Sequence, residues 1–194
     1  MSTPDVVTVP LRRVFPWNPG ASPGSRFSPS FVPEPTGRGR FDLPRRLSPV
    51  LYAAETTDHA VGEMLQSWRG QPLEPYHLTR AGFPLAIVEV EVPSPSASHW
   101  ADLCDASYLH HTETAPDATA SRHRHITQPL ALAAWEADYH GLRWWSSFWG
   151  DWHTVVLFTA RMGGGGLRFG VPEVLTIHHP AVTEAAALLG MLRR

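Results

Sequence analysis

Three residues in one short stretch have side chains suited to chemistry on a charged substrate: Arg40, Tyr52 and Glu63. Arg40 follows a glycine-rich segment, and Tyr52 lies in a short apolar run. Glu63 has apolar neighbours, so we expect it at the edge of a helix face that becomes buried. A carboxylate is costly to bury unless it is paired or used. The sequence leaves two explanations open, a structural ion pair with Arg40 or Arg69, or catalysis.

The histidines are less informative, although they form three close pairs: His110-His111, His123 with His125, and His178-His179. A metal site needs two ligands on one face and a third donor, whereas adjacent histidines point apart on a helix or strand. No HExxH or similar spacing is present. We therefore expect structural or exposed histidines and no metal site.

Other candidate motifs are weak. Gly163–Gly166 lacks the GxGxxG spacing of a nucleotide loop and is expected to form a flexible turn. Ser146 and Ser147 are not in a GxSxG elbow, which argues against a hydrolase triad. Four tryptophans lie close together in the sequence: Trp144, Trp145, Trp149 and Trp152. They indicate either core packing or the aromatic wall of a ligand pocket.

Composition excludes several classes of function. All sixteen basic residues are arginine, so a Schiff-base lysine, a Walker A lysine and a serine–lysine hydrolase are ruled out. The formal charge of -2 argues against a general nucleic-acid or membrane-surface binder. Cys104 is the one cysteine, which excludes an internal disulfide. With no signal peptide and no membrane span expected, the sequence predicts a cytoplasmic protein.

The pattern predicts strands and helices that do not alternate regularly, which favours an α+β fold over a doubly wound sheet. We expect one domain over 1–194, with a Pro/Gly/Ser-rich loop at 16–39 that Phe27 and Phe31 pin to the body. The predicted strands are 5–15, 49–54, 84–92, 142–149, 153–162 and 171–177, with a hairpin turn at Gly150-Asp151.

The predicted helices follow from caps and periodicity. One begins at Thr57 or Asp58 and ends near Trp68, before Gly70. Another spans 129–140, with Pro129 in its first turn and Gly141 as its C-terminal cap. Further helical segments are expected at 75–81, 101–113 and 180–194, whereas 114–125 is polar and predicted to be a loop.

Taken together, three motifs resemble the RES domain family. They are GRFDLP (39–44), PVLYAAETTDHAVGEML (49–65) and GLRWWSSFWGDWHTVVLF (141–158). The family's arginine, tyrosine, glutamate and serine fall on Arg40, Tyr52, Glu63 and Ser146. An earlier family arginine falls on Arg13 or Arg12. The resemblance covers about residues 10–161, and 171–194 adds a C-terminal strand and helix.

This sequence departs from the family pattern at two places. Trp144-Trp145 stand where many members have Tyr-Pro, and the loop before Arg40 is long. A second match at Arg26 leaves two choices for the family arginine. The distance to Tyr52 favours Arg40.

The resemblance implies a fold like that of ADP-ribosyltransferases, with twisted mixed and antiparallel sheets and flanking helices. It implies a toxin that cleaves the nicotinamide–ribose bond of NAD+, paired with an Xre-type helix-turn-helix antitoxin. The bond would be cleaved by water or by phosphate, as in an NAD+ glycohydrolase or phosphorylase. An ADP-ribosyltransferase acting on a protein and a non-catalytic binding module are the alternatives. No cofactor is expected, because NAD+ is the substrate and inorganic phosphate the candidate co-substrate.

The resemblance also assigns roles to single residues. Glu63 would stabilise the oxocarbenium-like ribose, and Arg40 and Arg13 would bind the pyrophosphate. Tyr52 would stack on the nicotinamide ring, and Ser146 would hydrogen-bond the nicotinamide end without acting as a nucleophile. Arg26 and Trp145 complete the residues expected at NAD+. The apolar C-terminal helix can serve the core or an interface between copies of the chain.

Overall fold

The computed structural model describes residues 8–93, 99–146, 149–162 and 166–191. The chain divides into two compact units, each made of three segments of the sequence. The first unit comprises Met1–Pro10, Val32–Ala53 and Glu91–Arg168. The second unit comprises Leu11–Phe31, Ala54–Val90 and Phe169–Arg194.

The first unit is built on a mixed sheet. Its strands follow the order β2 (Val50–Ala54), β7 (His153–Phe158), β6 (Gly141–Trp145) and β5 (Trp100–Asp102). β6 and β7 are antiparallel, with Gly141 opposite Leu157 and Trp145 opposite His153, whereas β5 runs parallel to β6. The hairpin predicted around Gly150-Asp151 is confirmed. Residues 147–148 of the predicted first hairpin strand lie outside the described residues.

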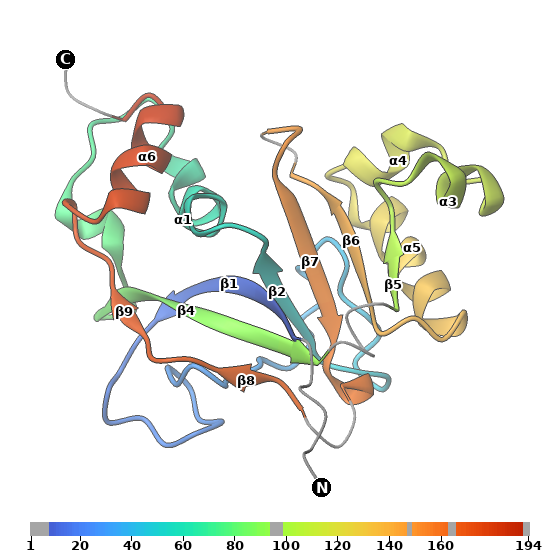
Figure 1. The fold of residues 1–194 in the computed structure, drawn as a ribbon, viewed down its shortest axis with the longest axis horizontal. Helices are drawn as coiled ribbons and strands as arrows, with labels where there is room; N and C mark the ends of the chain where they lie inside the picture. Colours follow the sequence, from blue (N-terminus) through green and yellow to red (C-terminus); the bar gives the residue numbers. More distant parts are fainter. Residues whose placement is uncertain (1–7, 94–98, 147–148, 163–165, 192–194) are drawn as a thin grey trace, which may run out of the picture. The chain divides into compact units, whose positions relative to one another are not determined.

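Helices of the first unit gather beside β5 and β6 (Figure 1). They are α3 (Ala106–His111), α4 (Pro116–Ala120) and α5 (Arg124–Glu136), and the 3₁₀ turn η3 (Thr159–Arg161) follows directly after β7. Helices α4 and α5 both contact β6. The buried core of this unit consists of apolar side chains from the sheet, the helices and the segment before β2: Phe41, Leu43, Val50, Ala101, Leu103, Leu109, Ala131, Ala134, Leu142, Trp144, Val156 and Phe158.

Helix α5 differs from the prediction at both ends. It begins at Arg124, so Pro129 lies inside it, where the missing N–H removes one intrahelical bond. Burial of Thr127, Ala131 and Ala134 along one face offsets that loss. The helix ends at Glu136, and the predicted cap Gly141 begins β6 instead. A side chain at Gly141 would collide with the carbonyl oxygen of Val156, so the close strand approach explains this glycine.

The segment from 100 to 125 was only partly predicted. Trp100–Asp102 forms a strand and not the start of a helix, and α3 begins only after Asp105, whose carboxylate accepts a hydrogen bond from the Ser107 N–H at 2.8 Å. The predicted loop at 114–125 contains α4, with Pro116 in its first turn.

The second unit contains strands β1 (Thr8–Pro16), β3 (Thr79–Arg80), β4 (Phe83–Pro93), β8 (Arg168–Phe169) and β9 (Glu173–Val174). The order is β3-β4-β1, and β8 and β9 pair with β4. β1 is antiparallel to the end of β2, where Arg12 lies opposite Ala54. Of the strand predicted at 171–177, the structure forms two residues, Glu173 and Val174 of β9.

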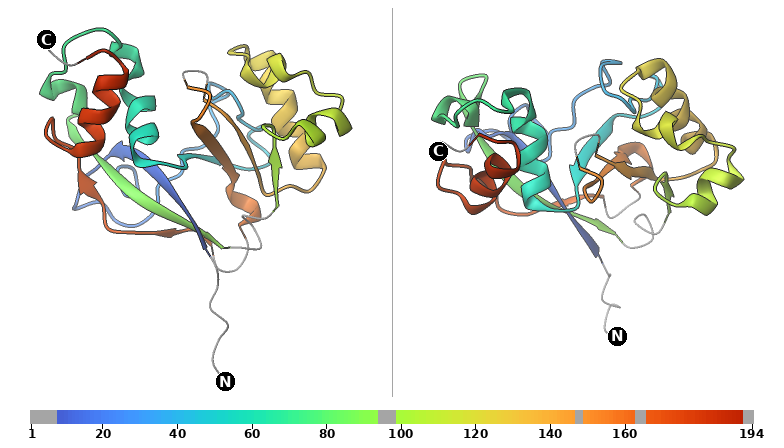
Figure 2. Two further views of the ribbon diagram at one scale, coloured as in Figure 1. Left: turned by 45° about the horizontal axis from the view of Figure 1, so that its top comes forward. Right: turned by 90° about the horizontal axis from the view of Figure 1, so that it is seen from above.

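Two helices of this unit, α1 (Thr57–Leu65) and α6 (Pro180–Leu188), lie side by side in all three ribbon views (Figures 1 and 2). The cap of α1 is Thr56, one residue earlier than predicted; its hydroxyl accepts a hydrogen bond from the His59 N–H at 3.3 Å. The 3₁₀ turns η1 (Gln66–Trp68) and η2 (Pro75–Leu78) follow. The helix predicted to reach Trp68 is α-helical to Leu65 and continues as η1, and Gly70, at φ 78°, follows it.

The loop before Arg40 contains no helix or strand, as predicted, and the ring of Phe27 lies 4.5 Å from that of Phe83. Of the predicted Gly163–Gly166 turn, residues 163–165 lie outside the described residues. The mixed sheet, the hairpins and the non-alternating helices confirm the α+β class. No helix among the described residues is long and apolar enough to cross a membrane.

Candidate functional site

In the first unit, Tyr52 fixes the turn that carries Arg40. The Tyr52 hydroxyl donates a hydrogen bond to Asp42 Oδ1 at 3.0 Å and accepts one from the Phe41 N–H at 3.0 Å. The other Asp42 oxygen accepts a hydrogen bond from the Gly39 N–H at 2.9 Å. The backbone on both sides of Arg40 is thereby tied to strand β2.

Asp42 is the residue of this group that the sequence reasoning missed. It is buried, at 7% exposure, and its carboxylate joins the Gly39 N–H to the Tyr52 hydroxyl. Its position in the GRFDLP motif was the available signal. Gly39 is required for a steric reason, because a Cβ there would overlap both the Asp42 carboxylate and the Tyr52 hydroxyl.

The guanidinium of Arg40 lies against aromatic rings. Its carbon is 5.3 Å from the ring centroid of Phe41 and 6.0 Å from that of Trp144, within the range of a cation–π interaction. Its Nη2 donates to the Thr119 carbonyl at 2.8 Å. The Tyr52 ring meets Trp144 edge-on, with centroids 6.2 Å apart. The structure therefore brings Arg40, Tyr52 and Trp144 together.

Electrostatics keep the Tyr52 hydroxyl protonated. Burial, and then the Asp42 carboxylate, raise the pKa of Tyr52 well above its ordinary value, although the Arg40 charge acts in the opposite direction. A protonated hydroxyl is the form that can donate to Asp42. Tyr52 thus holds the Arg40 turn by hydrogen bonds, in addition to any surface that its ring offers a ligand.

Strand β6 separates the remaining candidates of this unit. Successive strand residues point to opposite faces, so Trp144 faces one side and Trp145 the other, and Ser146 follows the last strand residue. Trp144 and Ser146 are buried, at 4% and 6% exposure, and the Ser146 N–H donates to the Trp152 carbonyl at 2.6 Å. Trp144 and Ser146 are thus both withdrawn from solvent, whereas Trp145 is half-buried.

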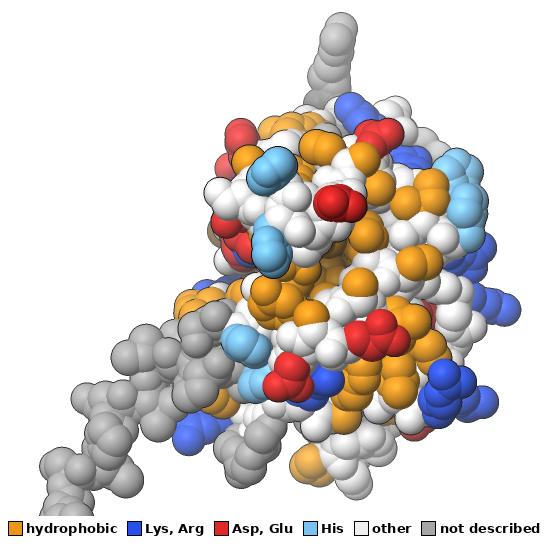
Figure 3. Space-filling view, turned by 90° about the vertical axis from the view of Figure 1, so that its right-hand side faces the viewer, with side chains coloured by type: hydrophobic (Ala, Val, Ile, Leu, Met, Phe, Trp, Pro, Cys, Tyr) orange, Lys and Arg blue, Asp and Glu red, His pale blue; other side chains and the backbone are white. Residues whose placement is uncertain are grey.

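Trp145 lines a separate open cavity of about 860 Å³ beside α3 and α4. Its other lining residues include Cys104, Leu109, His110 and Glu113. Figure 3 shows this side of the molecule, where apolar side chains lie between histidines and charged groups. On strand β6, Trp145 therefore points away from the face of Trp144, the ring that contacts Arg40.

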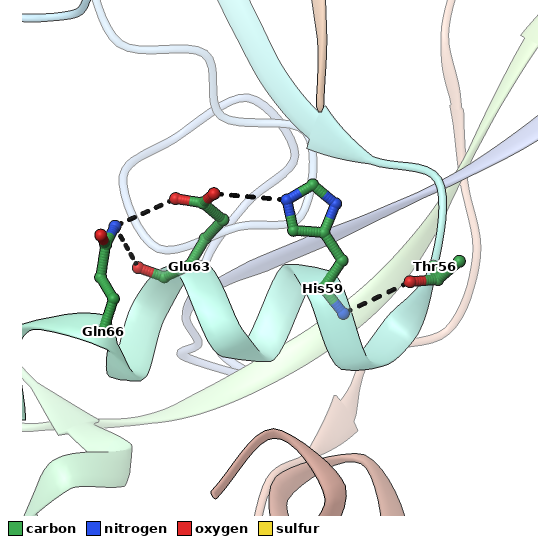
Figure 4. A network of polar contacts seen from close by, with 4 residues as sticks. All are labelled: Thr56, His59, Glu63 and Gln66. Atoms are coloured by element: carbon green, nitrogen blue, oxygen red, sulfur yellow. Dashed lines mark hydrogen bonds and ion pairs between the residues drawn. The ribbon is translucent and has the colours of Figure 1, made fainter. Parts of the chain in front are cut away.

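In the second unit, Glu63 projects from α1 and is held by His59 of the same helix and by Gln66, the first residue of η1 (Figure 4). One carboxylate oxygen is 3.3 Å from His59 Nε2, one turn earlier, and the other accepts a hydrogen bond from the Gln66 amide at 3.0 Å. His59 is buried, whereas the Glu63 side chain keeps 32% exposure. The carboxylate is oriented and still reachable from solvent.

The arginines of this unit have different surroundings. Arg12 forms an ion pair with Glu89 at 2.7 Å, which gives it a structural role. Arg13 donates to the Pro29 carbonyl at 2.9 Å, and burial lowers the pKa of its guanidinium to about 10, so it remains charged at neutral pH. Arg26 is exposed and stacks on Phe27, at 4.7 Å.

These positions bear on the open choice between Arg40 and Arg26. The guanidinium of Arg40 lies with Trp144, beside Tyr52, whereas that of Arg26 lies on an exposed loop of the other unit. The local geometry favours Arg40 as the arginine that belongs with Tyr52.

A comparison with protein families identifies a RES domain over residues 10–169. The chain belongs to the RES domain family. Its fold is similar to that in a crystal structure of the M. tuberculosis MbcT–MbcA toxin–antitoxin complex, with a TM-score of 0.61 and 15% sequence identity. That likeness covers 94% of this chain and 90% of the other. Among curated proteins, none matches the sequence.

In this RES domain, the paired histidines are exposed or lie at the end of a helix. Within the described part of the chain, no three His, Cys, Asp or Glu side chains come close enough to hold an ion. His110, His111, His123 and His125 are exposed. His179 caps α6 by accepting a hydrogen bond from the Ala181 N–H at 3.1 Å. The prediction of structural or exposed histidines is confirmed for these residues.

Proposed function

We propose that this RES domain protein is an enzyme that cleaves the nicotinamide–ribose bond of NAD+. The observation that carries the proposal is Glu63, a carboxylate oriented by His59 and Gln66 and still 32% exposed. It falls on the position of the family's glutamate. A fixed carboxylate that solvent can reach is suited to stabilising positive charge that develops on a bound substrate.

In the proposed reaction, the bond between the nicotinamide nitrogen and the ribose carbon breaks, and its electron pair leaves with nicotinamide. Positive charge then develops on the ribose, and the Glu63 carboxylate stabilises it. Attack by water yields ADP-ribose and a proton, as in a glycohydrolase. Attack by inorganic phosphate yields ADP-ribose phosphorylated at the same carbon, as in a phosphorylase.

Arginine supplies the proposed recognition of the pyrophosphate, because a guanidinium matches phosphate oxygens in a bidentate manner. Arg40 is supported by its fixed turn, and Arg13 by a charge that is partly withdrawn from solvent. We assign Tyr52 and Ser146 to the nicotinamide end. Arg26 and Trp145 are the other proposed contacts of NAD+. They have less support, because Arg26 is exposed and Trp145 lines the cavity beside α3 and α4.

The partner class follows from the same family. We propose that the protein is the toxin of a toxin–antitoxin pair with an Xre-type antitoxin. Support comes from RES family membership and from the similarity in fold to a chain of a toxin–antitoxin complex. Co-purification with the product of a neighbouring helix-turn-helix gene tests this part independently of the chemistry.

Product analysis tests the reaction and identifies the acceptor. The purified protein is incubated with NAD+ in phosphate-free buffer and in buffer with phosphate, and the products are separated and weighed by mass spectrometry. Free nicotinamide with ADP-ribose supports hydrolysis, and a phosphorylated ADP-ribose supports phosphorolysis. If NAD+ labelled in its ADP-ribose part is used and the label is recovered on protein instead, the enzyme is an ADP-ribosyltransferase. Intact NAD+ with no labelled protein would overturn the enzymatic proposal.

A further inference from the structure

The turn that carries Arg40 is held from a second direction by helix α5. The peptide N–H groups of the turn bind Asp42 and Tyr52, as described above. Its carbonyl oxygens accept hydrogen bonds from two adjacent α5 side chains, Thr127 and Gln128. Backbone groups outside regular structure need such partners where they are withdrawn from solvent, and the half-buried Gly39 and Arg40 carbonyls bond to side chains far away in the sequence.

Thr127 holds the carbonyl of Arg40 itself. Its side chain is fully buried, and its hydroxyl donates a short hydrogen bond to the Arg40 carbonyl oxygen. A second, longer contact of 3.5 Å joins the same hydroxyl to the carbonyl of His123, the N-cap of α5. The backbone of Arg40 is therefore tied directly to the helix.

Gln128 holds the carbonyls that precede Arg40. Its side-chain nitrogen donates to Gly37 at 3.1 Å and to Gly39 at 2.9 Å, so the same amide group binds two positions of the turn. Gln128 also lines an open groove of about 530 Å³ between this segment and α5. A substitution of similar size at Gln128 can therefore be accommodated without disrupting the core.

Helix α4 holds the guanidinium end of the Arg40 side chain. The Thr119 carbonyl accepts a hydrogen bond from the Arg40 guanidinium at 2.8 Å, and the buried Thr119 hydroxyl donates to Pro116 within α4 at 2.8 Å. The backbone and the head group of Arg40 are thus both held by the α4–α5 segment.

We propose that Thr127 and Gln128 are positioning residues, which direct Arg40 toward a phosphate group of its substrate. This inference rests on the proposed function, in which Arg40 binds the NAD+ pyrophosphate. A bidentate contact needs the guanidinium within a fraction of an ångström of its place, and three side-chain hydrogen bonds to the turn supply that constraint. Neither residue needs to touch the substrate.

The test is a double-mutant cycle with Arg40. The variants are Gln128→Met, which removes both donors at similar size, and Thr127→Val and Thr127→Ser, of which only serine keeps the hydroxyl. Glu136→Gln, exposed at the end of the same helix, is the control. Nicotinamide release is measured against NAD+ concentration for each variant, alone and combined with Arg40→Ala.

Gln128→Met and Thr127→Val are expected to raise KM for NAD+ roughly ten- to hundredfold, with serine close to wild type and the control unchanged. In the Arg40→Ala background, the same substitutions are expected to raise KM little further, because they act on KM by positioning Arg40. Full additivity with Arg40→Ala, or an unchanged KM in both variants, would overturn the inference.

A second readout separates this inference from the proposed function. Hydrogen exchange at the Gly39 and Phe41 amides reports how firmly the turn is held, whether or not NAD+ is the substrate. Faster exchange in Thr127→Val and Gln128→Met than in wild type and Glu136→Gln supports positioning by α5. Unchanged exchange rejects it. Absent nicotinamide release by folded wild-type protein rejects the function alone.

Discussion

Gly39 is the residue on which the geometry of the Arg40 turn depends most directly. Its neighbours Asp42 and Tyr52 occupy the space that any side chain would need. We predict that Gly39→Ala lowers the free energy of unfolding by about 1–3 kcal/mol, because the overlap forces the turn apart. It should also abolish NAD+ turnover. Chemical denaturation and nicotinamide release measure the two effects.

Gly150→Ala is the matched control, since no atom of the described residues, its chain neighbours aside, lies within 4 Å of a Cβ built there. It should leave stability and turnover close to wild type. Equal effects of the two substitutions would contradict the steric explanation for Gly39.

His77 gives the stability a predictable dependence on pH. Its Nδ1 accepts a hydrogen bond from the Glu74 N–H at 3.0 Å, and burial lowers its pKa below the ordinary value of 6.5. The unfolded chain then binds a proton that the folded chain does not, so stability falls as pH decreases below about 6.5. Burial also lowers the pKa of His140, so this residue likewise makes the folded protein less stable as pH decreases.

We predict that His77→Gln, which keeps an acceptor for Glu74, makes this decline shallower without removing it. Urea unfolding between about pH 7.5 and 5.5 measures the slope in both proteins. A decline of equal steepness in wild type and variant would assign the pH dependence to other groups.

At the scale of elements, the pairing of α1 with α6 holds the helix that carries Glu63. Small side chains line the buried face of α6, among them Ala181, Ala185 and Ala186. We predict that Ala185→Leu lowers the free energy of unfolding by about 1–3 kcal/mol, because a fully buried position cannot accept the extra volume. Ala187→Leu, exposed on the same helix, should stay within about 0.5 kcal/mol of wild type. Thermal denaturation compares the two, and equal losses would contradict a close α1–α6 contact.

Elements with strong local signals could be predicted from the sequence, and the others could not. The apolar run of β4 and the capped start of α1 are found within a residue or two. The start of α5 is hidden, because its first turn is polar and Pro129 imitates a helix start. Burial of Thr127 and Ala131 in the folded protein extends the helix to Arg124. The residue pattern of 114–125 does not predict that extension.

The same distinction applies to the candidate site. Motif order selects Arg40, Tyr52, Glu63 and Ser146 as candidates, because each lies in a recognisable short segment. It missed Thr127 and Gln128, which bond to backbone carbonyls more than eighty residues away. A hydrogen bond from a side chain to a distant backbone carbonyl requires no particular spacing of residues, so the sequence contains no motif for it.

At the scale of the whole molecule, the RES domain match includes residues of both compact units. Arg40, Tyr52 and Ser146 belong to the first unit, and Glu63 and Arg13 to the second. A fold similarity over nine-tenths of each chain at 15% identity means that the architecture persists while most residues change. Fold alone does not establish an activity, so the proposal depends on the named residues.

The most direct test of the central claim is nicotinamide release by Glu63→Gln compared with wild type at saturating NAD+. The substitution removes the negative charge at nearly constant size. We predict a fall in kcat of roughly a hundred- to a thousandfold, with the thermal midpoint unchanged. Glu184→Gln, exposed on α6 in the same unit, should retain wild-type kcat. Wild-type kcat in a folded Glu63→Gln protein would contradict the account.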